Sequence, residues 1–306
     1  MTRKKWTGHL AVFTAYLIFG FNIVVCKDLT SEPYISPIGI FLLRSVGAGS
    51  IFWLLSLLVP REKVARRDMP GIFLASLLGF FLTQITFLMA IPLISPMESA
   101  LMSSLSPIYT MLIAAVALRE PITAKKVGGV ALSFAGIIYL ILTGSMGEAT
   151  AGSTVSLWGL LLMVGNALFF SLYLGIFRPL IGRYSVVTFM KWIFLFSTIM
   201  ALPFGIGDVM ATDLAALPPR WVAELLYLIV MATFVAYFLI PLGQKIIRPT
   251  LVSMYSYVQP IVAISISIWL GMDTLSVTKI AATAMVFGGV YIVSRSRSAR
   301  SLPDDR

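Results

Sequence analysis

The chain has 306 residues, of which 58% are hydrophobic and only 12% are charged, and its mean hydropathy is +0.94. A soluble domain carries about a quarter of its residues as charged side chains, so this composition excludes an ordinary soluble protein and favours a membrane protein. The net charge of +10 does not indicate nucleic-acid binding, because the basic residues form short clusters between apolar runs and no continuous stripe.

Apolar runs long enough to cross a bilayer recur along the whole chain. A hydrocarbon core of ~30 Å needs about 20 helical residues, and a helix satisfies its own backbone hydrogen bonds there. The basic N-terminus leads into the first run with no cleavage site after Cys26, so we interpret it as a retained span. The sequence predicts an all-α membrane protein with ten transmembrane helices, at residues 8–26, 36–59, 70–91, 95–118, 125–143, 157–177, 185–207, 221–243, 249–270 and 277–294.

Most of the stretch from Ser95 to Leu142 is repeated 153 positions later. The shift needs no gap and aligns Pro96 with Pro249, Ser103 with Ser256, Pro107 with Pro260, Lys126 with Lys279, Phe134 with Phe287 and Gly136 with Gly289. The same shift aligns Gln84 with Tyr237. We therefore expect two related repeats, at residues 1–147 and 148–306, joined through the Gly-, Ser- and Thr-rich linker from Thr143 to Ser156.

The distribution of basic residues predicts how the spans are oriented. With the N-terminus in the cytoplasm, 18 lysines and arginines fall in inside segments, and only Lys27, Arg220 and Lys279 fall outside. We therefore expect a multi-pass protein of the cytoplasmic (inner) membrane with both termini cytoplasmic. Because five crossings per repeat is an odd number, the second repeat enters the membrane from the opposite side. Inverted repeats are typical of secondary transporters whose substrate site lies near the midplane.

Two signatures resemble a known family. The segment Leu118-Arg119-Glu120-Pro121-Ile122-Thr123, followed by Lys126, Gly128, Gly129 and Phe134-Ala135-Gly136-Ile137-Ile138, is similar to the signature of the EamA branch of the drug/metabolite transporter superfamily. Phe19-Gly20-Phe21-Asn22 with the later Lys27 resembles its first-helix pattern, with Phe in place of Trp. The resemblance implies ten helices, with helices 1, 3, 4, 6, 8 and 9 around a central cavity and 5 and 10 peripheral. It also implies export or exchange of small metabolites, often amino acids or related compounds.

Polar and proline residues inside the spans indicate where a substrate would bind. Pro107 and Pro260 lie mid-span in paired helices, where each removes a backbone hydrogen bond, so they are candidate hinges or ordinary packed kinks. Large polar side chains in a span need partners or a wet cavity, whereas Ser103, Ser106, Ser253 and Ser256 also suit close helix packing. The candidate cavity residues are Asn22, Gln84, Glu98, Met102, Ser106, Asn166, Tyr173, Tyr237, Tyr255 and Gln259. Interhelical hydrogen bonds without substrate contact are the alternative.

The few ionisable residues within spans leave several roles open. Arg44 could form an ion pair, have another structural role, or recognise an anion, and Glu98 could bind an amine or a proton or lie in a wet vestibule. Lys191 and Glu224 suit the membrane interface, and Glu120 suits a helix cap or an ion pair. The first span lacks an acidic residue, so proton coupling would need Glu98 or another group, and facilitated export or exchange is as consistent with the sequence.

Enzymatic alternatives have little support in the sequence. His9 is the only histidine, Cys26 is the only cysteine, and a Gly-x-x-x-x-Gly-Lys phosphate loop is absent. We expect a secondary transporter with no catalytic residues, metal site or cofactor, and with a small-molecule substrate and membrane lipid as partners; a homodimer stays open. An intramembrane enzyme acting on a lipid or isoprenoid is the alternative, and a sensor or scaffold is a third reading. The aromatic residues Phe170, Tyr173, Tyr237, Tyr255 and Tyr257 favour a partly apolar cargo.

Overall fold

The computed structural model describes residues 3–31, 34–118, 124–146 and 156–295, and these residues form helices and connecting turns with no strand among them. The all-helical fold class expected from the sequence is confirmed for this part of the chain. Glu120, with most of the first signature's loop and most of the expected linker, lies outside the described residues.

The first half of the chain begins with two uninterrupted helices, α1 (Arg3–Leu29) and α2 (Pro37–Leu58). Ser36 caps α2 by accepting a hydrogen bond from the backbone of Gly39, and Pro37 follows at the first helical position. A third helical stretch is built from short pieces, which are η1 (Arg66–Asp68), α3 (Met69–Ser76), η2 (Leu77–Leu82), α4 (Thr83–Ala90) and η3 (Ile91–Leu93). It is followed by α5 (Pro96–Ser103), α6 (Ser106–Leu118) and α7 (Ala124–Met146).

The second half follows a similar order. It contains α8 (Leu157–Ile176), the short α9 (Arg178–Arg183), α10 (Val186–Ala211) and η4 (Leu214–Ala216). The next stretch consists of α11 (Pro219–Ile229), η5 (Val230–Val235) and α12 (Ala236–Ile246). The last helices are α13 (Pro249–Met254), η6 (Tyr255–Tyr257), α14 (Val258–Trp269) and α15 (Val277–Arg295).

Seven helical stretches of the described residues are long and apolar enough to cross a membrane. They are Lys5–Leu29, Pro37–Leu58, Arg66–Leu93, Leu157–Ile176, Val186–Ala211, Pro219–Ile246 and Leu251–Trp269, and the apolar helices Val127–Tyr139 and Val277–Gly289 are shorter. Apolar side chains such as Leu58 and Trp269, each 83% exposed, lie on the outer surface of the bundle, where lipid would cover them. The chain is therefore a multi-pass membrane protein.

The helices are irregular at equivalent positions of the two halves, which are 153 residues apart in the sequence. The structure has one π-helical turn at Leu77–Leu82 and another at Val230–Val235, which are exactly 153 residues apart. The helix is also interrupted just before each mid-span proline, at Ser104 and Leu105 before Pro107 and in the 3₁₀ turn η6 before Pro260. Proline cannot donate a backbone hydrogen bond to the preceding turn, which explains both interruptions.

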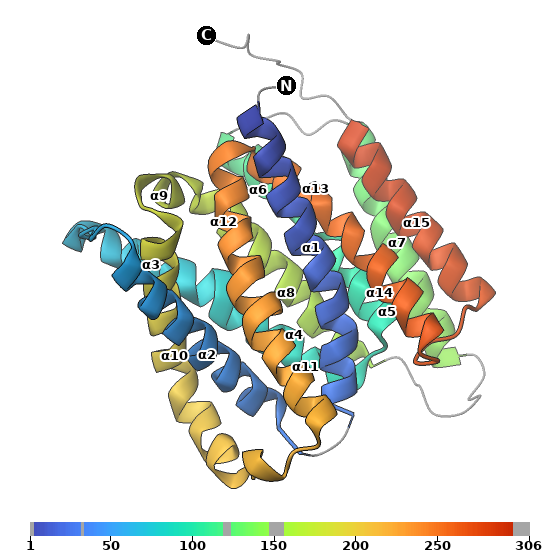
Figure 1. Ribbon diagram of the computed structural model, residues 1–306. Helices are drawn as coiled ribbons and strands as arrows, with labels where there is room; N and C mark the ends of the chain where they lie inside the picture. The colour runs from blue at the N-terminus through green and yellow to red at the C-terminus, as the bar shows by residue number, and fades with distance from the viewer. Residues whose placement is uncertain (1–2, 32–33, 119–123, 147–155, 296–306) are drawn as a thin grey trace.

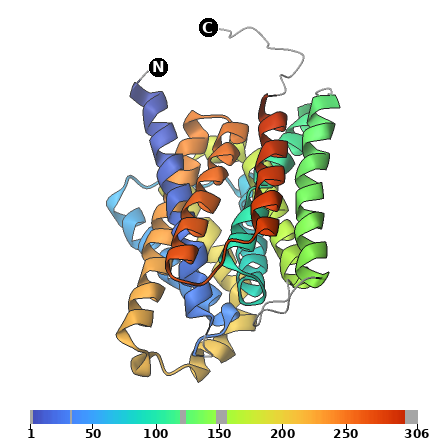
Figure 2. The same cartoon turned by 90° about the vertical axis from the view of Figure 1, so that its right-hand side faces the viewer.

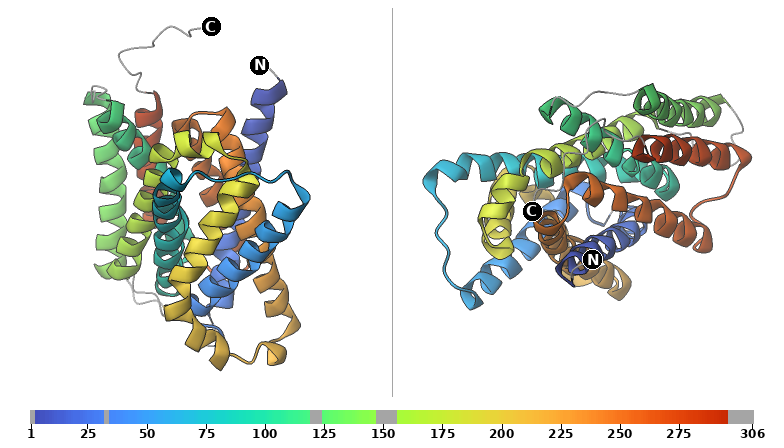
Figure 3. Two further views of the ribbon diagram at one scale, coloured as in Figure 1. Left: turned by 90° about the vertical axis from the view of Figure 1, so that its left-hand side faces the viewer. Right: turned by 90° about the horizontal axis from the view of Figure 1, so that it is seen from above.

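The helices pack in pairs that repeat between the two halves (Figure 1). Helix α1 packs against α12 and α14, while its counterpart α8 packs against α4 and α6, and α2 packs along α10. Helices α7 and α15 lie side by side at one edge of the bundle (Figures 2 and 3). Helix α1 begins and α15 ends at the same end of the bundle, which we call the N-terminal end.

Close backbone contact holds α7 against α15. The Ser133 hydroxyl donates to the carbonyl oxygen of Val286, 153 residues away, at 3.1 Å. A Cβ atom on Gly289 would lie 2.3 Å from the carbonyl oxygen of Gly129 and 2.6 Å from the amide nitrogen of Ser133. Small residues allow helices to approach in this way within lipid. The position therefore requires glycine.

We predict that Gly289→Ala lowers the free energy of unfolding by about 1–3 kcal/mol, because the backbone atoms opposite cannot move aside without separating the helices. Unfolding by SDS in mixed micelles measures the change. Gly128→Ala on α7 is the matched control, since its added Cβ meets nothing within 4 Å. Equal unfolding midpoints for the two variants would contradict the close packing.

Candidate functional site

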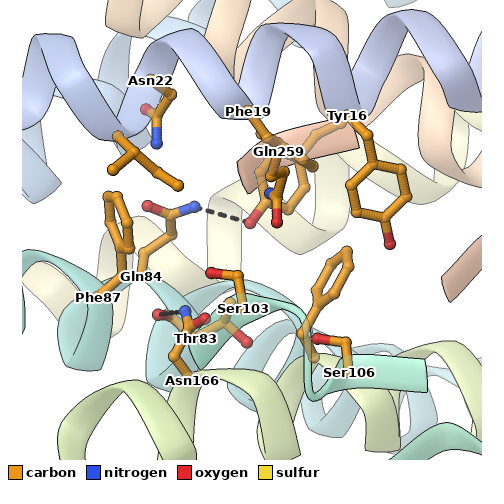
Figure 4. A pocket seen from close by; sticks show the side chains of 13 residues that line it. Tyr16, Phe19, Asn22, Thr83, Gln84, Phe87, Ser103, Ser106, Asn166 and Gln259 are labelled. Atoms are coloured by element: carbon orange, nitrogen blue, oxygen red, sulfur yellow. Dashed lines mark hydrogen bonds between the residues drawn. The ribbon is translucent and has the colours of Figure 1, made fainter. Parts of the chain in front are cut away.

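A cavity of about 50 Å³ lies inside the bundle, between helices from both halves of the chain (Figure 4). Its walls come from α1, α4, α5, α6, α8, α12 and α14. The lining residues are Tyr16, Phe19, Asn22, Ile23, Thr83, Gln84, Phe87, Ser103, Ser106, Asn166, Phe170, Tyr237 and Gln259.

A hydrogen bond between the halves crosses one side of this cavity. The side-chain amide nitrogen of Gln84 donates to the hydroxyl of Tyr237 at 2.8 Å, and the two residues are equivalent under the 153-residue shift. Both side chains are buried, Gln84 to 5% exposure. The other amide atom of Gln84, its Oε1 oxygen, is buried without a hydrogen-bond partner. An unpaired buried acceptor is costly, so this oxygen is available to a ligand.

The π-helical turns supply carbonyl groups close to the cavity. In a π turn the normal backbone pattern shifts by one residue, and side chains can take up the displaced acceptors. The Thr83 hydroxyl donates to Leu78 O at 2.6 Å, and the Thr233 hydroxyl donates to Leu228 O at 2.6 Å. The backbone carbonyl of Thr83 accepts from the amide of Asn166 at 2.7 Å, which ties α8 to α4.

A chain of polar contacts runs from the cavity wall to a buried arginine. Cys26 Sγ contacts Asn22 Oδ1 at 3.6 Å, and Arg44 Nη1 contacts the same sulfur at 3.6 Å. Arg44 Nε donates to the Thr233 hydroxyl at 2.8 Å, while its Nη2 is buried without a partner. Arg44 is 0% exposed, and no carboxylate pairs with it among the described residues. Of the roles left open by the sequence, these contacts favour a structural one.

Aromatic rings pack against one another around the cavity. Phe19 contacts Tyr16, Phe170 and Tyr237 edge to face, with ring centroids 5.8, 6.4 and 5.7 Å apart. Such contacts hold rings in fixed orientations and contribute beyond the burial of area. The aromatic walls are therefore rigid, and only their inner faces are open to a ligand.

Six of the ten residues expected at a cavity line this one: Asn22, Gln84, Ser106, Asn166, Tyr237 and Gln259. The other four lie elsewhere. Glu98 forms a capping box with Ser95, in which its Oε2 accepts from the Ser95 backbone at 2.9 Å, and Met102 is fully buried in the core.

Tyr173 and Tyr255 also lie outside the lining. The Tyr173 ring packs against Gly79 and stacks on Phe170 and Phe177, and the Tyr255 hydroxyl hydrogen-bonds to His9 Nδ1 at 2.8 Å. The helix is interrupted at Ser104 and Leu105, directly after the turn that holds Met102, so a regular helical face does not continue from Met102 past Pro107.

Several residues that line the cavity were not among the ten candidate cavity residues. Phe19 lies three residues before Asn22 and Phe87 three residues after Gln84, so a same-face search around each amide would have found these two. Ile23 and Thr83 are direct neighbours of the amides in the chain, and Tyr16 carries no distinctive sequence signal. Ser103 donates to the Ser99 carbonyl, which suits helix packing, and it also lines the cavity.

Polar contacts close the bundle at its N-terminal end. Asp68 accepts hydrogen bonds from Arg183 at 2.9 Å and from the Tyr184 hydroxyl at 2.6 Å, and Lys245 donates to the Tyr184 carbonyl. The Ser185 backbone donates to Glu62 at 2.9 Å. Partial burial acts to raise the pKa of the Glu62 carboxyl, but the hydrogen bonds from Ser185 and Thr188 outweigh it and hold that pKa below its usual value.

A second set of polar contacts closes the opposite end. Arg220 pairs with Asp28 at 2.5 Å and with Glu224 at 3.0 Å. Lys27 donates to the carbonyl of Ile91 at 3.1 Å. Asp273 pairs with Lys279 at 2.6 Å and accepts from the Met97 backbone, and Ser36 donates to Asp208. No group of three or more potential metal ligands occurs within the described ranges.

Comparisons with known proteins point to one family. The model of the EamA-like transporter family matches residues 6–142 and 157–295. An uncharacterized transporter of Archaeoglobus fulgidus is 23% identical over 96% of this chain and 100% of its own length, and the uncharacterized transporter YetK of Bacillus subtilis is 24% identical over 95% and 88%. An S-adenosylmethionine/S-adenosylhomocysteine transporter of Chlamydia muridarum is 28% identical over 49% of this chain and 46% of its own. A protein crystal structure with 17% identity has a TM-score of 0.65 and covers 94% of this chain and 96% of that one, so it shares the fold.

We predict that Tyr237→Phe lowers the free energy of unfolding by about 1–3 kcal/mol, because the buried amide of Gln84 loses its acceptor. Adding Gln84→Leu removes the amide that has lost its partner, so the double variant should recover part of the lost free energy of unfolding. Unfolding by SDS measures both. Tyr34→Phe, which alters a half-exposed ring, is the control. Strict additivity of the two cavity substitutions would contradict the hydrogen bond.

Proposed function

The chain belongs to the EamA-like transporter family, and on that premise we propose that it moves a small metabolite across the cytoplasmic membrane by opening its central cavity to each side in turn. Membership confirms the resemblance drawn from the two sequence signatures. Several relatives are named as transporters. The cavity supports this assignment most directly, because it lies between the two halves of the chain and is lined by both polar and aromatic groups.

The proposed architecture is ten transmembrane helices in two inverted repeats, residues 1–147 and 148–306, around the cavity. The equivalence of Gln84 and Tyr237 supports it, because equivalent residues of two halves meet at an axis that relates them. The two π turns, offset by the same 153 residues, support it as well. In this arrangement the N-terminal end of the bundle faces the cytoplasm and both termini are cytoplasmic, as the positive charges predict.

Alternating exposure requires the two closed ends to open separately. We assign the contacts of Asp68, Arg183 and Tyr184 to the cytoplasmic closure, and the pair of Arg220 and Asp28 to the outer one. Each closure joins segments from different halves, so relative movement of the halves would break it. The helix interruptions before Pro107 and Pro260 are where α6 and α14 would bend.

The proposed activity is export or exchange of an amino acid or a related compound. Relatives named for S-adenosylmethionine and S-adenosylhomocysteine support a small organic cargo. The alternative of an intramembrane enzyme has less support, because Asp208, Asp213 and Asp273, which lie between the expected spans, have separate partners among the described residues. Asp208 binds Ser36, Asp273 binds Lys279, and Asp213 accepts from the Ala216 backbone. We therefore propose a transporter without catalytic residues.

We predict that Gln259→Ala reduces efflux from proteoliposomes by at least about tenfold, because it removes a central amide that can contact cargo. Vesicles loaded with labelled amino acids and related metabolites give the rates, under a proton gradient or with counter-substrate. Ser265→Ala, on the exposed face of the same helix, is the matched control. Equal efflux by both variants would show that the cavity does not lie on the transport path. No efflux by the native chain would contradict transport of that pool of metabolites.

We also predict the side of the membrane on which each early connection lies. Reporters fused after residues 30, 94 and 150 should lie outside, and reporters after residues 63 and 121 should lie in the cytoplasm. Alkaline phosphatase activity and green fluorescence report the two sides. A reversed pattern at all five positions would contradict the proposed orientation, and loss of alternation would contradict the number of crossings.

A further inference from the structure

The lining of the cavity contains no charged side chain. Its polar groups are amides and hydroxyls, and Asp, Glu, Lys, Arg and His are all missing from the lining residues that the structure describes. A charge taken into the membrane interior without a partner costs several kcal/mol. The cavity therefore suits a cargo that is uncharged where it contacts the wall.

Contacts on the side of Asn22 away from the cavity determine which atom of its amide faces the cavity. Its Oδ1 oxygen is occupied by the Cys26 thiol, and the sulfur in turn accepts from Arg44 Nη1. Arg44 is itself held by Thr233. With Oδ1 engaged, Nδ2 is the atom of Asn22 that points into the cavity, as Figure 4 shows. Asn22 is thus a hydrogen-bond donor towards a ligand.

The amide of Gln84 is oriented the other way round, with its nitrogen engaged and its oxygen available to a ligand. Its Nε2 nitrogen donates to Tyr237, which leaves the buried Oε1 without a partner. Gln84 is thus a hydrogen-bond acceptor towards a ligand. Figure 4 shows Asn22 and Gln84 on facing walls at the same end of the cavity, so one ligand edge can reach both.

Other lining groups extend this recognition surface. The Gln259 amide lies at the centre of the cavity, and the buried Tyr16 hydroxyl has no hydrogen-bond partner. The ring faces of Phe19, Phe87 and Phe170 complete the wall with surfaces suited to a planar, partly apolar body.

The charge of Arg44 does not convert the cavity into an anion site. Cys26 lies between its guanidinium and the lining residue Asn22, and Arg44 itself is not a lining residue. Arg44 and Cys26 are positioning residues for the Asn22 amide.

We propose, on the basis of the transport function above, that within the class of amino acids and related compounds the cargo is one that presents a partly aromatic body and an uncharged carboxamide-type edge to this wall, with the acceptor and donor atoms of that edge pairing with Asn22 Nδ2 and Gln84 Oε1. A primary amide or the equivalent edge of a nucleobase has this pattern. A carboxylate does not, because it offers two acceptors and a charge to a wall that supplies one donor and one acceptor.

Nicotinamide and nicotinate are the matched probes, since they share a ring and differ only in carboxamide against carboxylate. Equilibrium binding of each to the purified full chain at neutral pH gives the comparison. The native chain should bind nicotinamide at least about tenfold more tightly than nicotinate. Asn22→Leu and Gln84→Leu should each reduce that preference to less than about threefold, and Ser265→Ala should leave it unchanged.

Binding of the same two probes to two variants of Cys26 tests whether this residue orients the Asn22 amide. Cys26→Ala should weaken nicotinamide binding several-fold while leaving nicotinate binding unchanged, because the Asn22 amide can then rotate. Cys26→Ser retains a donor and an acceptor at that place and should restore the preference. Equal effects of alanine and serine on both probes would show a packing role only.

Equal or tighter binding of nicotinate, binding of neither probe, or a preference that survives both leucine variants would overturn the proposed cargo class. The efflux measurement on the metabolite pool separates this failure from failure of the transport function. Efflux that depends on Gln259 without any carboxamide preference would leave transport intact and reject the cargo class alone.

Discussion

The hydrogen bond between Gln84 and Tyr237 is the contact on which the account of this molecule depends. In lipid, a polar side chain inside a helix must find a partner, and at this place each half of the chain supplies the partner of the other at 2.8 Å. Satisfying both groups requires α4 and α12 to face each other. Once they do, α1 and α8 complete the walls, and the space that remains between the side chains is the cavity.

Irregular backbone is concentrated around that space. The π turns of η2 and η5 precede Gln84 and Tyr237, and the interruptions before Pro107 and Pro260 lie beside Ser106 and Gln259. Regular helices would place their carbonyls in their own hydrogen bonds, whereas at the π turns the hydroxyls of Thr83 and Thr233 take up displaced carbonyls. The proposed binding site and the proposed bending points therefore lie next to the same irregular backbone.

The amino-acid sequence predicted a large part of this arrangement, and the reasons for its failures are physical. The sequence identified four amides that line the cavity, because a large amide is rare in an apolar helix and needs a hydrogen-bond partner. They are Asn22, Gln84, Asn166 and Gln259. Glu98 lies outside the lining and forms a capping box, which uses the same residue type at a helix start as a substrate contact would. Of the aromatic walls, Phe170 and Tyr237 were named from the sequence, but Tyr16, Phe19 and Phe87 were not, because Phe and Tyr are common throughout such a chain and only the packing shows which of them line the cavity.

The central claim is that one cavity is exposed to both sides of the membrane in turn. A single cysteine at Ser103, in the Cys26→Ser background, places a reporter on the wall, and an impermeant thiol reagent can be added to either side of oriented vesicles. The account predicts labelling from each side, slowed in both cases by bound cargo. Labelling from one side only, at a rate that cargo does not change, would contradict it.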